Sequence, residues 1–459
     1  MTDPGGTTDR LLTGWGRTAA SRATVRPAHD PAEITDALKH AGPRGVLARG
    51  LGRSYGDATQ NAGGEVLDMT TLSRIHALDL NAGTITVDAG ISLDALMRLL
   101  VPLGWFVPVT PGTRYVTVGG AIAADIHGKN HHVESSFCAH VHQLVLATPR
   151  GDRLTLSADA TPDEFAATAG GMGLTGVVLE VTFRLLPIET SLMRVDADRL
   201  PDLDALMARM ADGDEGYRYS VAWIDTLAAG RHLGRSVLTR ADHARASDLA
   251  ETRRAATPLA YHPNARLQAP SGIPSGLVNR FTVAAFNELW FRKAPAHRVG
   301  GLESIPTFFH PLDMVRDWNR VYGPRGFVQY QFVVPFGADG DAFVRLALER
   351  LSAARCPSFV TVLKRFGPQD GLLSFPTEGW TLAVDLPAPH PGLGPLLDDL
   401  DEGVANAGGR VYLAKDSRLR PELLETMYPR LPEWRAIRDR LDPDRAMNSD
   451  LNRRLGLVG

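Results

Sequence analysis

The chain contains very little cysteine: only Cys138 and Cys356 occur among its 459 residues. Two cysteines exclude a disulfide framework and a zinc site built from cysteine alone. A single disulfide would use both, but we expect two free thiols instead. Cysteine therefore contributes neither cross-linking nor metal chemistry to the predicted function.

An excess of charge of one sign is also missing, because the formal net charge is −3. Such a balance gives no basic footprint, so we expect no nucleic-acid partner. No run of 18 apolar residues occurs, so no transmembrane helix is expected. The first residues, MTDPGGTTDRLLTGWGRT, lack the apolar core of a signal peptide. The default expectation is the cytoplasm, with any membrane association peripheral.

The pattern of apolar residues predicts an α+β protein with a large core. Hydrophobic residues make up 44% of the chain, which is ordinary for a globular protein of two or three domains. Asp30, Pro31 and Glu33 form a helix start, with a capping side chain and a proline at the first helical position. A strand over 46–49 follows. The pattern changes after Pro187, which predicts a boundary near residue 190.

The second half alternates strands with helices at short spacing, as α+β proteins do. We expect helices at 203–211 and 340–353, and strands at 219–224, 327–334, 359–366 and 380–386. Residues 256–303 are punctuated by proline and glycine, with scattered apolar residues. This stretch predicts a long loop, and loops of that length are usually functional or mobile.

The first glycine-rich tract is ARGLGRSYGD at residues 48–57. Its glycines allow positive φ, so successive backbone N–H groups can turn toward one anion, and Ser54 adds a hydroxyl. Such a loop suits a pyrophosphate. It is not the dinucleotide fingerprint of parallel α/β folds, because the third glycine comes one residue late and no clear helix follows. An ordinary glycine-rich turn is the alternative.

The second tract is PGTRYVTVGGAIAADIHGKNHH at residues 111–132. Its glycines and alanines would let the backbone approach a flat ligand, with His127 and Lys129 at the end of that surface. Three histidines within six residues suggest zinc, but no cysteine or glutamate has the usual spacing. We favour cofactor-contacting or surface histidines. A third tract, 170–176, indicates another close backbone approach or a tight turn.

Polar residues in the second half follow a strand pattern. Period two places Gln329 and Gln331 on one face of a strand, where two amides could bind sugar hydroxyls. A solvent-facing strand is the alternative. Lys364 ends another strand, and Thr381 and Ala383 share a face of a third.

One further candidate lies near the C-terminus, in the tract YLAKDSR. Burial of Lys415 at a strand end could lower its pKa and make it a base or a hydrogen-bond donor. The alternative is an ordinary surface pair of Lys415 with Asp416.

Together the three glycine tracts resemble the vanillyl-alcohol-oxidase (PCMH) type of FAD-binding fold. Within that fold, ARGLGRSYGD, TVGGAIAADIHGKNHH, FFHPLDM, WNRVYGP, QYQF and AKDSR resemble the decaprenylphosphoryl-β-D-ribose oxidases of actinobacterial arabinan synthesis. The likeness runs from about Leu12 to Leu457. It implies an FAD-binding domain of residues 6–190, completed by 410–459, and an antiparallel-sheet substrate domain of residues 191–409.

The resemblance also implies which residues hold the cofactor. They are Ala48, Arg49, Gly50, Leu51, Gly52, Arg53, Ser54, Tyr55, Gly56, Asp57, Ala58, Gly112, Thr117, Val118, Gly119, Gly120, Ala124, Asp125, Ile126, His127, Val178 and Tyr412. Many relatives attach FAD covalently to a histidine just after the first glycines. Arg53 occupies that place here, which implies non-covalent FAD.

The implied reaction oxidises the ribose 2-hydroxyl of a polyprenyl-phosphate sugar, with hydride passing to flavin N5. Lys415 and Tyr55 are the implied catalytic residues. The implied substrate contacts are His127, Lys129, Trp223, Gln329, Gln331, Lys364, Thr381, Ala383 and Lys415. Thr381 and Ala383 replace the Asn and Cys of some relatives, which leaves the polarity of that side of the pocket open. No metal is implied.

The resemblance implies partners as well. An NADH-dependent short-chain reductase would return hydride to the opposite face of the sugar, completing an epimerisation that supplies cell-wall arabinan. The stretch 256–303, with the loop 307–317, would form a lid that admits the lipid. A lipid substrate implies a peripheral protein at the inner membrane or cell envelope, on the periplasmic side.

Two other functions stay open. One is an aldonolactone or alditol oxidase of the same fold that uses oxygen on a free sugar. The other is a non-catalytic flavin- or lipid-binding module, against which Lys415 and the two glutamines argue.

Overall fold

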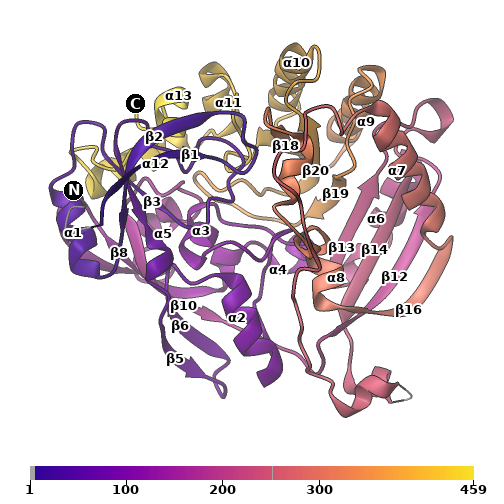
Figure 1. The fold of residues 1–459 in the computed structure, drawn as a ribbon, viewed down its shortest axis with the longest axis horizontal. Coiled ribbons are helices and arrows are strands. Elements are labelled where there is room, and N and C mark those ends of the chain that lie inside the picture. Colours follow the sequence, from indigo (N-terminus) through magenta and orange to yellow (C-terminus); the bar gives the residue numbers. More distant parts are fainter. Residues whose placement is uncertain (1–5, 251) are drawn as a thin grey trace.

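The computed structural model describes residues 6–250 and 252–459. The expectation that the chain lacks a signal peptide concerns its first residues, of which 1–5 lie outside the described residues. Helices and mainly antiparallel sheets are mixed along the chain (Figure 1), so the expected α+β class is confirmed.

The first half builds two sheets. The smaller has the strand order β1-β2-β4-β3, formed by Thr8–Thr13, Ala20–Pro27, Glu65–Asp68 and Val46–Arg49. The larger has the order β5-β6-β10-β8-β9, formed by Ile75–Asp79, Thr84–Asp88, Val177–Arg184, Val141–Ala147 and Arg153–Leu156. A two-stranded pair joins β7 (Trp105–Phe106) to β11 (Leu186–Pro187).

Helices of the first half begin at the caps that the sequence indicates. The carboxylate of Asp30 accepts a hydrogen bond from the N–H of Ala32 at 2.6 Å, at the start of α1 (Pro31–Lys39). Ser92 caps α2 (Leu93–Leu100). The remaining helices of this half are α3 (Val118–Ala123), α4 (His131–Glu134) and α5 (Pro162–Thr168).

The second half forms one eight-stranded sheet with the order β16-β12-β14-β13-β19-β20-β18-β21, in which every pairing is antiparallel. Its strands are His297–Ser304, Leu192–Leu200, Ser236–His243, Tyr219–Ile224, Thr361–Phe366, Gly379–Pro387, Phe327–Val334 and Arg410–Val411. Three helices, α6 (Leu203–Ala211), α9 (Ala338–Ala353) and α10 (Leu393–Asn406), contact strands of this sheet and lie on its outer side in Figure 1.

The expectation of a long loop at 256–303 is wrong for much of that stretch. Residues Arg280–Lys293 form α7, whose cap Asn279 accepts hydrogen bonds from two backbone N–H groups. β16 follows and pairs with β12, while the short β15 (Leu267–Gln268) pairs with β17 (Val315–Arg316). A short helix, α8 (Ile305–Phe309), comes after β16. Because α7 buries only Val283 and Asn287, its apolar residues do not form the inward stripe by which a helix is recognised in sequence.

The C-terminal segment leaves the edge of the large sheet at β21 and returns to the first half. Its helices are α11 (Leu424–Met427), α12 (Leu431–Leu441) and α13 (Asp450–Leu455), drawn in yellow over the indigo elements in Figure 1. Arg454 of α13 pairs with both carboxylate oxygens of Asp57 at 2.8 and 2.9 Å. The Trp434 indole donates to the carbonyl of Ala167. The domain division at residues 190 and 410 stays a prediction.

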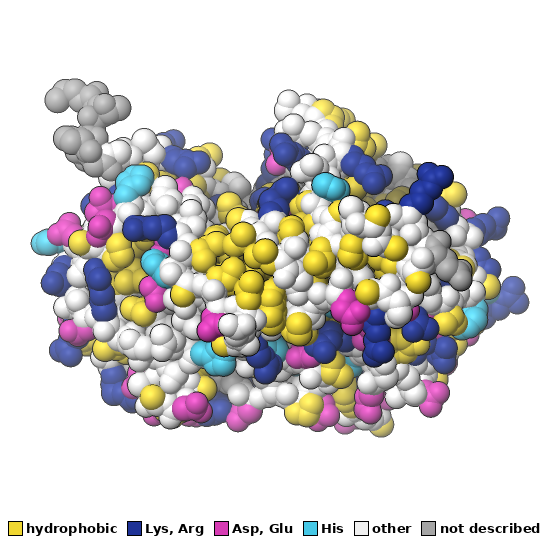
Figure 2. Space-filling model, turned by 90° about the horizontal axis from the view of Figure 1, so that it is seen from below, with side chains coloured by type: hydrophobic (Ala, Val, Ile, Leu, Met, Phe, Trp, Pro, Cys, Tyr) yellow, Lys and Arg dark blue, Asp and Glu magenta, His cyan; other side chains and the backbone are white. Residues whose placement is uncertain are grey.

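The surface and the cysteines complete the description. From below, hydrophobic side chains gather in the middle of the molecule, with charged side chains more frequent toward the edges (Figure 2). In the described part of the chain, no helix combines the length and the apolar character needed to cross a membrane. Cys138 and Cys356 are free and buried, so the expectation of two free thiols is confirmed.

Candidate active site

Strand register gathers the polar residues of the large sheet on one face. Gln331 lies opposite Ala383 and Gln329 opposite Asp385 across β18 and β20. Residues directly opposite in an antiparallel pair point to the same side of the sheet. The alternate residue Phe332 packs on Phe343 of the outer helix α9, so the two glutamines point inward. Both are buried, which excludes the solvent-facing alternative.

The neighbouring strands extend this inner face. Lys364 of β19 lies opposite Thr381 of β20, and Trp223 of β13 lies opposite Val362 of β19. Lys364 and Thr381 are buried, and Trp223 is half-buried with its indole N–H bonded to the carbonyl of Phe359 at 3.1 Å. Substrate residues proposed from separate tracts therefore occupy one continuous surface of four strands.

His127 reaches this surface from the first half of the chain. Its Nδ1 lies 3.1 Å from the Lys364 Nζ, and its Nε2 lies 3.0 Å from the Gln331 Nε2. Burial, with help from nearby Lys364, lowers the pKa of His127 well below its usual value, so the ring is neutral. The contact joins the central glycine tract to the sheet.

Hydrogen-bond counting assigns the protons in this network. The Thr381 hydroxyl donates to the carbonyl of Phe332 at 2.8 Å, so it accepts from the Gln331 amide at 3.1 Å. The second amide hydrogen then donates to His127 Nε2, and Nδ1–H donates to a neutral Lys364. Burial and two other lysines lower the pKa of Lys364 to about 7, which agrees with that state. Thr381 thus keeps this side of the pocket polar.

Lys415 lies at the junction of the two halves. Its Nζ is 4.0 Å from the centre of the Tyr55 ring, and the N–H of Tyr55 donates to the carbonyl of Ala414 at 3.0 Å. Burial lowers the pKa of Lys415 to about 8, while the charge of Asp385 opposes that shift. Burial also raises the pKa of Tyr55 well above its usual range. At neutral pH, Lys415 is a cation that loses its proton easily.

Asp385 is a residue that the sequence reasoning missed. Its Oδ1 accepts a hydrogen bond from Gln329 at 2.5 Å, and its Oδ2 is buried without a partner in the described part of the chain. Burial raises its pKa to about 7. The signal was present, because period two from Thr381 and Ala383 leads directly to Asp385 on the same face.

The local charge favours an anion. Lys129, Lys364 and Lys415 are near enough for the first and third to lower the pKa of the second, while the carboxylate of Asp385 acts on Lys415 and that of Glu303 on Lys129. Lys129 donates from Nζ to the carbonyl of Phe308, and burial lowers its pKa to about 7. A negative ligand here would stabilise the protonated forms of these lysines, which burial alone disfavours.

The first glycine loop has the properties of an anion cradle. Backbone N–H groups of residues 51–54 donate no hydrogen bond within the described residues. A Cβ on Gly50 would lie 2.2 Å from the Thr117 Oγ1, and one on Gly56 would lie 1.8 Å from the carbonyl oxygen of Asp416. Free donors on a crowded loop fit the pyrophosphate of a dinucleotide.

Residues outside that loop contact its side chains and its backbone. The Arg53 guanidinium stacks 3.8 Å from the Trp15 ring centre, and Arg49 donates to the carbonyls of Thr59 and Thr13. Ser54 holds Trp15 through its carbonyl at 2.8 Å. Arg53, which the sequence aligns with the attachment histidine of relatives, is therefore engaged with an indole.

The central tract lies against the loop. The Thr117 hydroxyl accepts from the N–H of Gly120 at 3.2 Å, which caps α3. Gly119 donates to the carbonyl of Ala89, and Ala89 donates to Leu179, so Val178 lies beside the same edge. The Tyr412 hydroxyl donates to the carbonyl of Ala124 at 2.8 Å. These contacts would form the walls of a flavin site.

Some proposed residues are placed elsewhere. Gly112 is exposed, and a Cβ there would meet nothing within 4 Å. The carboxylate of Asp125 accepts from Cys138 N–H, Gln369 and Ser374, so it is engaged within the protein. Ala58 is buried in the main core.

The other two histidines of the tract point to separate partners. His131 lies 2.8 Å from the amide oxygen of Gln369, and His132 contacts the carbonyls of Asp214 and Tyr217. Across residues 6–250 and 252–459, no cluster of three His, Cys, Asp or Glu side chains could hold a metal ion.

Two family models match parts of the chain. An FAD binding domain matches residues 22–157, which contain the first two glycine tracts, 48–57 and 111–132. A D-arabinono-1,4-lactone oxidase model matches residues 393–455, which contain Lys415. The expected FAD cofactor is therefore confirmed.

Whole-length comparisons agree. The chain is 45% identical to a decaprenylphosphoryl-beta-D-ribose oxidase of Mycolicibacterium smegmatis, over 98% of each chain. It is 25% identical to an L-gulono-1,4-lactone dehydrogenase of Mycobacterium tuberculosis, over 95% of this chain and 96% of that protein. A solved chain of BBE-like 1 from Physcomitrella patens superposes with a TM-score of 0.67 at 14% identity, covering 97% and 96%. That likeness confirms the fold class.

The crowding at Gly50 generates a prediction. In Gly50→Ala the new methyl would displace the buried Thr117 side chain and its cap. Overpacking of this kind costs about 1–3 kcal/mol. We expect FAD affinity to fall about tenfold or more, measured by titrating apoprotein with FAD. Gly42→Ala is the control, because its Cβ would meet nothing within 4 Å; equal affinities for the two variants would contradict the cradle.

Arg53 generates a second prediction. The loop contains no histidine, so we expect FAD to be released when the protein is precipitated with acid. Flavin absorbance should appear entirely in the supernatant. Flavin that stays with the pellet and co-migrates with the chain in denaturing electrophoresis would show a covalent link and contradict this.

Proposed function

Since the chain belongs to the decaprenylphosphoryl-β-D-ribose oxidase family, we propose that it oxidises the ribose 2-hydroxyl of decaprenylphosphoryl-β-D-ribose to the 2-keto sugar. It is an FAD-dependent oxidoreductase. The glycine loop at 48–57 and the tract around Thr117 would hold FAD, which would supply the capacity to accept a hydride from the substrate. The observation that carries the proposal is the junction at which Lys415, with its lowered pKa, meets Tyr55 and Asp385.

We propose that Lys415 takes the proton of the 2-hydroxyl as the hydride leaves C2. A pKa of about 8 makes its free amine accessible near physiological pH. Asp385 is proposed to position the ammonium group and to set that pKa. Gln329 and Gln331, as amides on one buried face, supply hydrogen bonds to the other sugar hydroxyls.

The phosphodiester of the substrate carries one negative charge. We propose that Lys129 and Lys364 bind it, because Lys364 is buried, Lys129 is half-buried, and neither faces a carboxylate at ion-pair distance among the described residues. Trp223, half-buried at the end of the same face, forms a wall of the sugar site. His127 bridges Lys364 and Gln331 through its two ring nitrogens.

Partners follow from the chemistry. The 2-keto product needs a hydride donor to become arabinose, so we propose an NADH-dependent short-chain reductase as the partner. A substrate with a polyprenyl tail remains in a bilayer, so the protein would work as a peripheral protein at the inner membrane. We propose the periplasmic side, as the family resemblance implies.

The match of residues 393–455 to a D-arabinono-1,4-lactone oxidase supports one alternative, a sugar oxidase that uses oxygen. The two functions differ in electron acceptor and substrate. Anaerobic addition of polyprenylphosphoryl ribose should bleach the flavin, with slow recovery in air. Rapid recovery in air, with turnover on free lactones or alditols, would favour the alternative. A protein that cannot be loaded with FAD would leave only a binding module.

Lys415 gives the sharpest test of the mechanism. We expect Lys415→Ala to keep its yellow colour but to reduce flavin about a hundredfold more slowly with substrate, the usual range for loss of a general base. Lys415→Arg keeps the positive charge but cannot accept a proton, so it should bind substrate and remain slow. Stopped-flow bleaching measures both; wild-type rates in either variant would exclude proton acceptance by Lys415.

The pH profile tests Asp385. Bleaching in the wild type should rise with pH through about 8, as Lys415 loses its proton. Asp385→Asn removes the negative charge that raises this pKa, so the rise should move to lower pH by about one unit. Asp401→Asn is the control, because Asp401 is also buried with its pKa raised to about 7 but pairs with Arg418. An unchanged profile in Asp385→Asn would exclude the coupling.

A further inference from the structure

Helix α7 exposes large apolar side chains that no part of the described chain covers. Phe281 is 71% exposed, Leu289 68%, Trp290 44% and Phe286 42%. Phe286 and Trp290 are four residues apart, and their rings stack with centres 6.0 Å apart. Phe281 and Leu289 lie on the same helix, one near each end. Monomeric proteins rarely leave such a contiguous apolar patch in water without a use for it.

Positive charge surrounds this helix. From residue 252 to residue 287 the chain contains four arginines and no acidic residue. Arg280 begins α7, and Arg292 and Lys293 end it. The acidic residue of the helix, Glu288, is paired with Arg235 and Arg292. An apolar face with a basic border is the pattern of helices that bind at anionic membrane surfaces.

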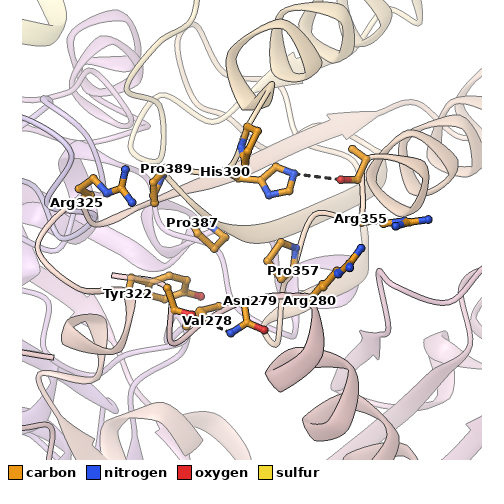
Figure 3. A pocket seen from close by; sticks show the side chains of 13 residues that line it. Val278, Asn279, Arg280, Tyr322, Arg325, Arg355, Pro357, Pro387, Pro389 and His390 are labelled. Carbon is orange, nitrogen blue, oxygen red and sulfur yellow. Dashed lines mark hydrogen bonds between the residues drawn. The ribbon is translucent and has the colours of Figure 1, made fainter. Parts of the chain in front are cut away.

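A cavity adjoins the start of α7 and has the same character. Arg280, Arg325 and Arg355 line it together with His390 and several prolines, and no acidic residue contributes. In Figure 3, Arg325 lies at one end of the labelled group, while Arg280 and Arg355 lie at the other. None of these three arginines forms an ion pair with a carboxylate anywhere in residues 6–250 or 252–459.

A chain of aromatic rings connects α7 with the reaction site. The ring centres of Phe286 and Phe359 are 5.9 Å apart, and those of Phe359 and Tyr322 are 5.7 Å apart. Tyr322 also lines the cavity. Tyr322 stacks at 4.2 Å on Phe327, and Phe327 lies 5.5 Å from Tyr55. Contiguous ring contacts, through the buried Tyr322 and Phe327, therefore link the exposed helix to Tyr55, which lies beside Lys415.

We propose that this α7 surface docks on an anionic lipid bilayer. The surface consists of Leu277, Phe281, Phe286, Leu289 and Trp290, with Arg280, Arg325 and Arg355. The aromatic side chains enter the interface while the arginines bind lipid phosphates. The proposal rests on the proposed function, because a lipid-linked sugar must reach Tyr55 from the bilayer. Docking through α7 would place the bilayer on the face of the molecule from which these packed rings lead to Tyr55.

Co-sedimentation of the FAD-loaded full chain tests the surface directly. The vesicles are phosphatidylcholine with phosphatidylglycerol, against phosphatidylcholine alone. We expect binding to the anionic vesicles, and at least about tenfold weaker binding for Phe281→Ser/Leu289→Ser/Trp290→Ser. Arg280→Gln/Arg325→Gln/Arg355→Gln should lose the preference for phosphatidylglycerol. Binding of both variants equal to wild type would overturn the proposal.

Matched controls use surface residues of the same kind elsewhere. Leu11, Leu80 and Leu346 are also exposed, and Arg10, Arg150 and Arg153 are exposed arginines. Their triple substitutions to serine and glutamine should leave vesicle binding unchanged. Equal losses in the controls would show a nonspecific surface effect and would overturn the assignment to α7.

A second measurement separates this proposal from the proposed function. Flavin bleaching is measured with substrate in vesicles and with a short-chain, water-soluble analogue. The α7 apolar variant should be slowed about tenfold with the vesicles only. Bleaching by the analogue without vesicle binding would overturn docking and leave the proposed oxidation intact. Vesicle binding without any bleaching would overturn the proposed oxidation and leave docking intact. If the α7 variants lost binding to the reductase but not to vesicles, the surface would be a protein interface.

Discussion

The register of three adjacent strands, β19, β20 and β18, is the constraint on which the site depends. Only this register places Lys364 beside Thr381, and Gln329 beside Asp385, on the face turned away from the outer helices. A slip of one residue would turn all of these side chains toward α9 and α10 and bring apolar side chains into the site. The outward contact of Phe332 with Phe343 favours this register, since a slip would turn Phe332 to the polar inner face and remove the contact. Packing on the outer face therefore fixes chemistry on the inner one.

Burial of these polar groups costs free energy, and contacts between the two halves of the chain offset that cost. His127 comes from the central tract, yet its two ring nitrogens contact Lys364 and Gln331 of the large sheet. Lys415 comes from the returning C-terminal segment, which Arg454 holds to the first loop through Asp57 and Asp416. A buried ionisable group without such contacts would shift to its neutral form or destabilise the fold. The site thus forms only when both halves and the C-terminal segment are assembled.

Secondary structure is predicted well from the sequence where the local pattern of apolar residues determines it. Features that depend on contacts with distant residues are predicted poorly. Strands Tyr219–Ile224 and Phe327–Val334 have the expected bounds, because period two runs between clear turn residues. Helix α7 was not predicted, because most of its apolar residues point outward and so do not form the inward-facing stripe by which a helix is recognised in a sequence. Asp385 was missed although Thr381 and Ala383 were noticed, because its importance comes from Gln329 on the next strand. Gly112 was included through resemblance, and no neighbouring atom requires a glycine there.

The lowered pKa values of the lysines link substrate binding to chemistry. In the free protein the ammonium form of each of the three lysines is disfavoured by burial, and that of Lys364 also by its cationic neighbours; Asp385 opposes this at Lys415 and Glu303 at Lys129. A phosphodiester anion beside Lys129 and Lys364 would stabilise their charged forms and cancel part of the field at Lys415. Asp385 acts in the same direction, because it stabilises the Lys415 cation that proton abstraction creates. Lys415 must be uncharged before it accepts the proton, and its protonated form must be stabilised afterwards. Asp385, a buried carboxylate whose own pKa is about 7, stabilises the protonated form and still leaves the uncharged amine accessible.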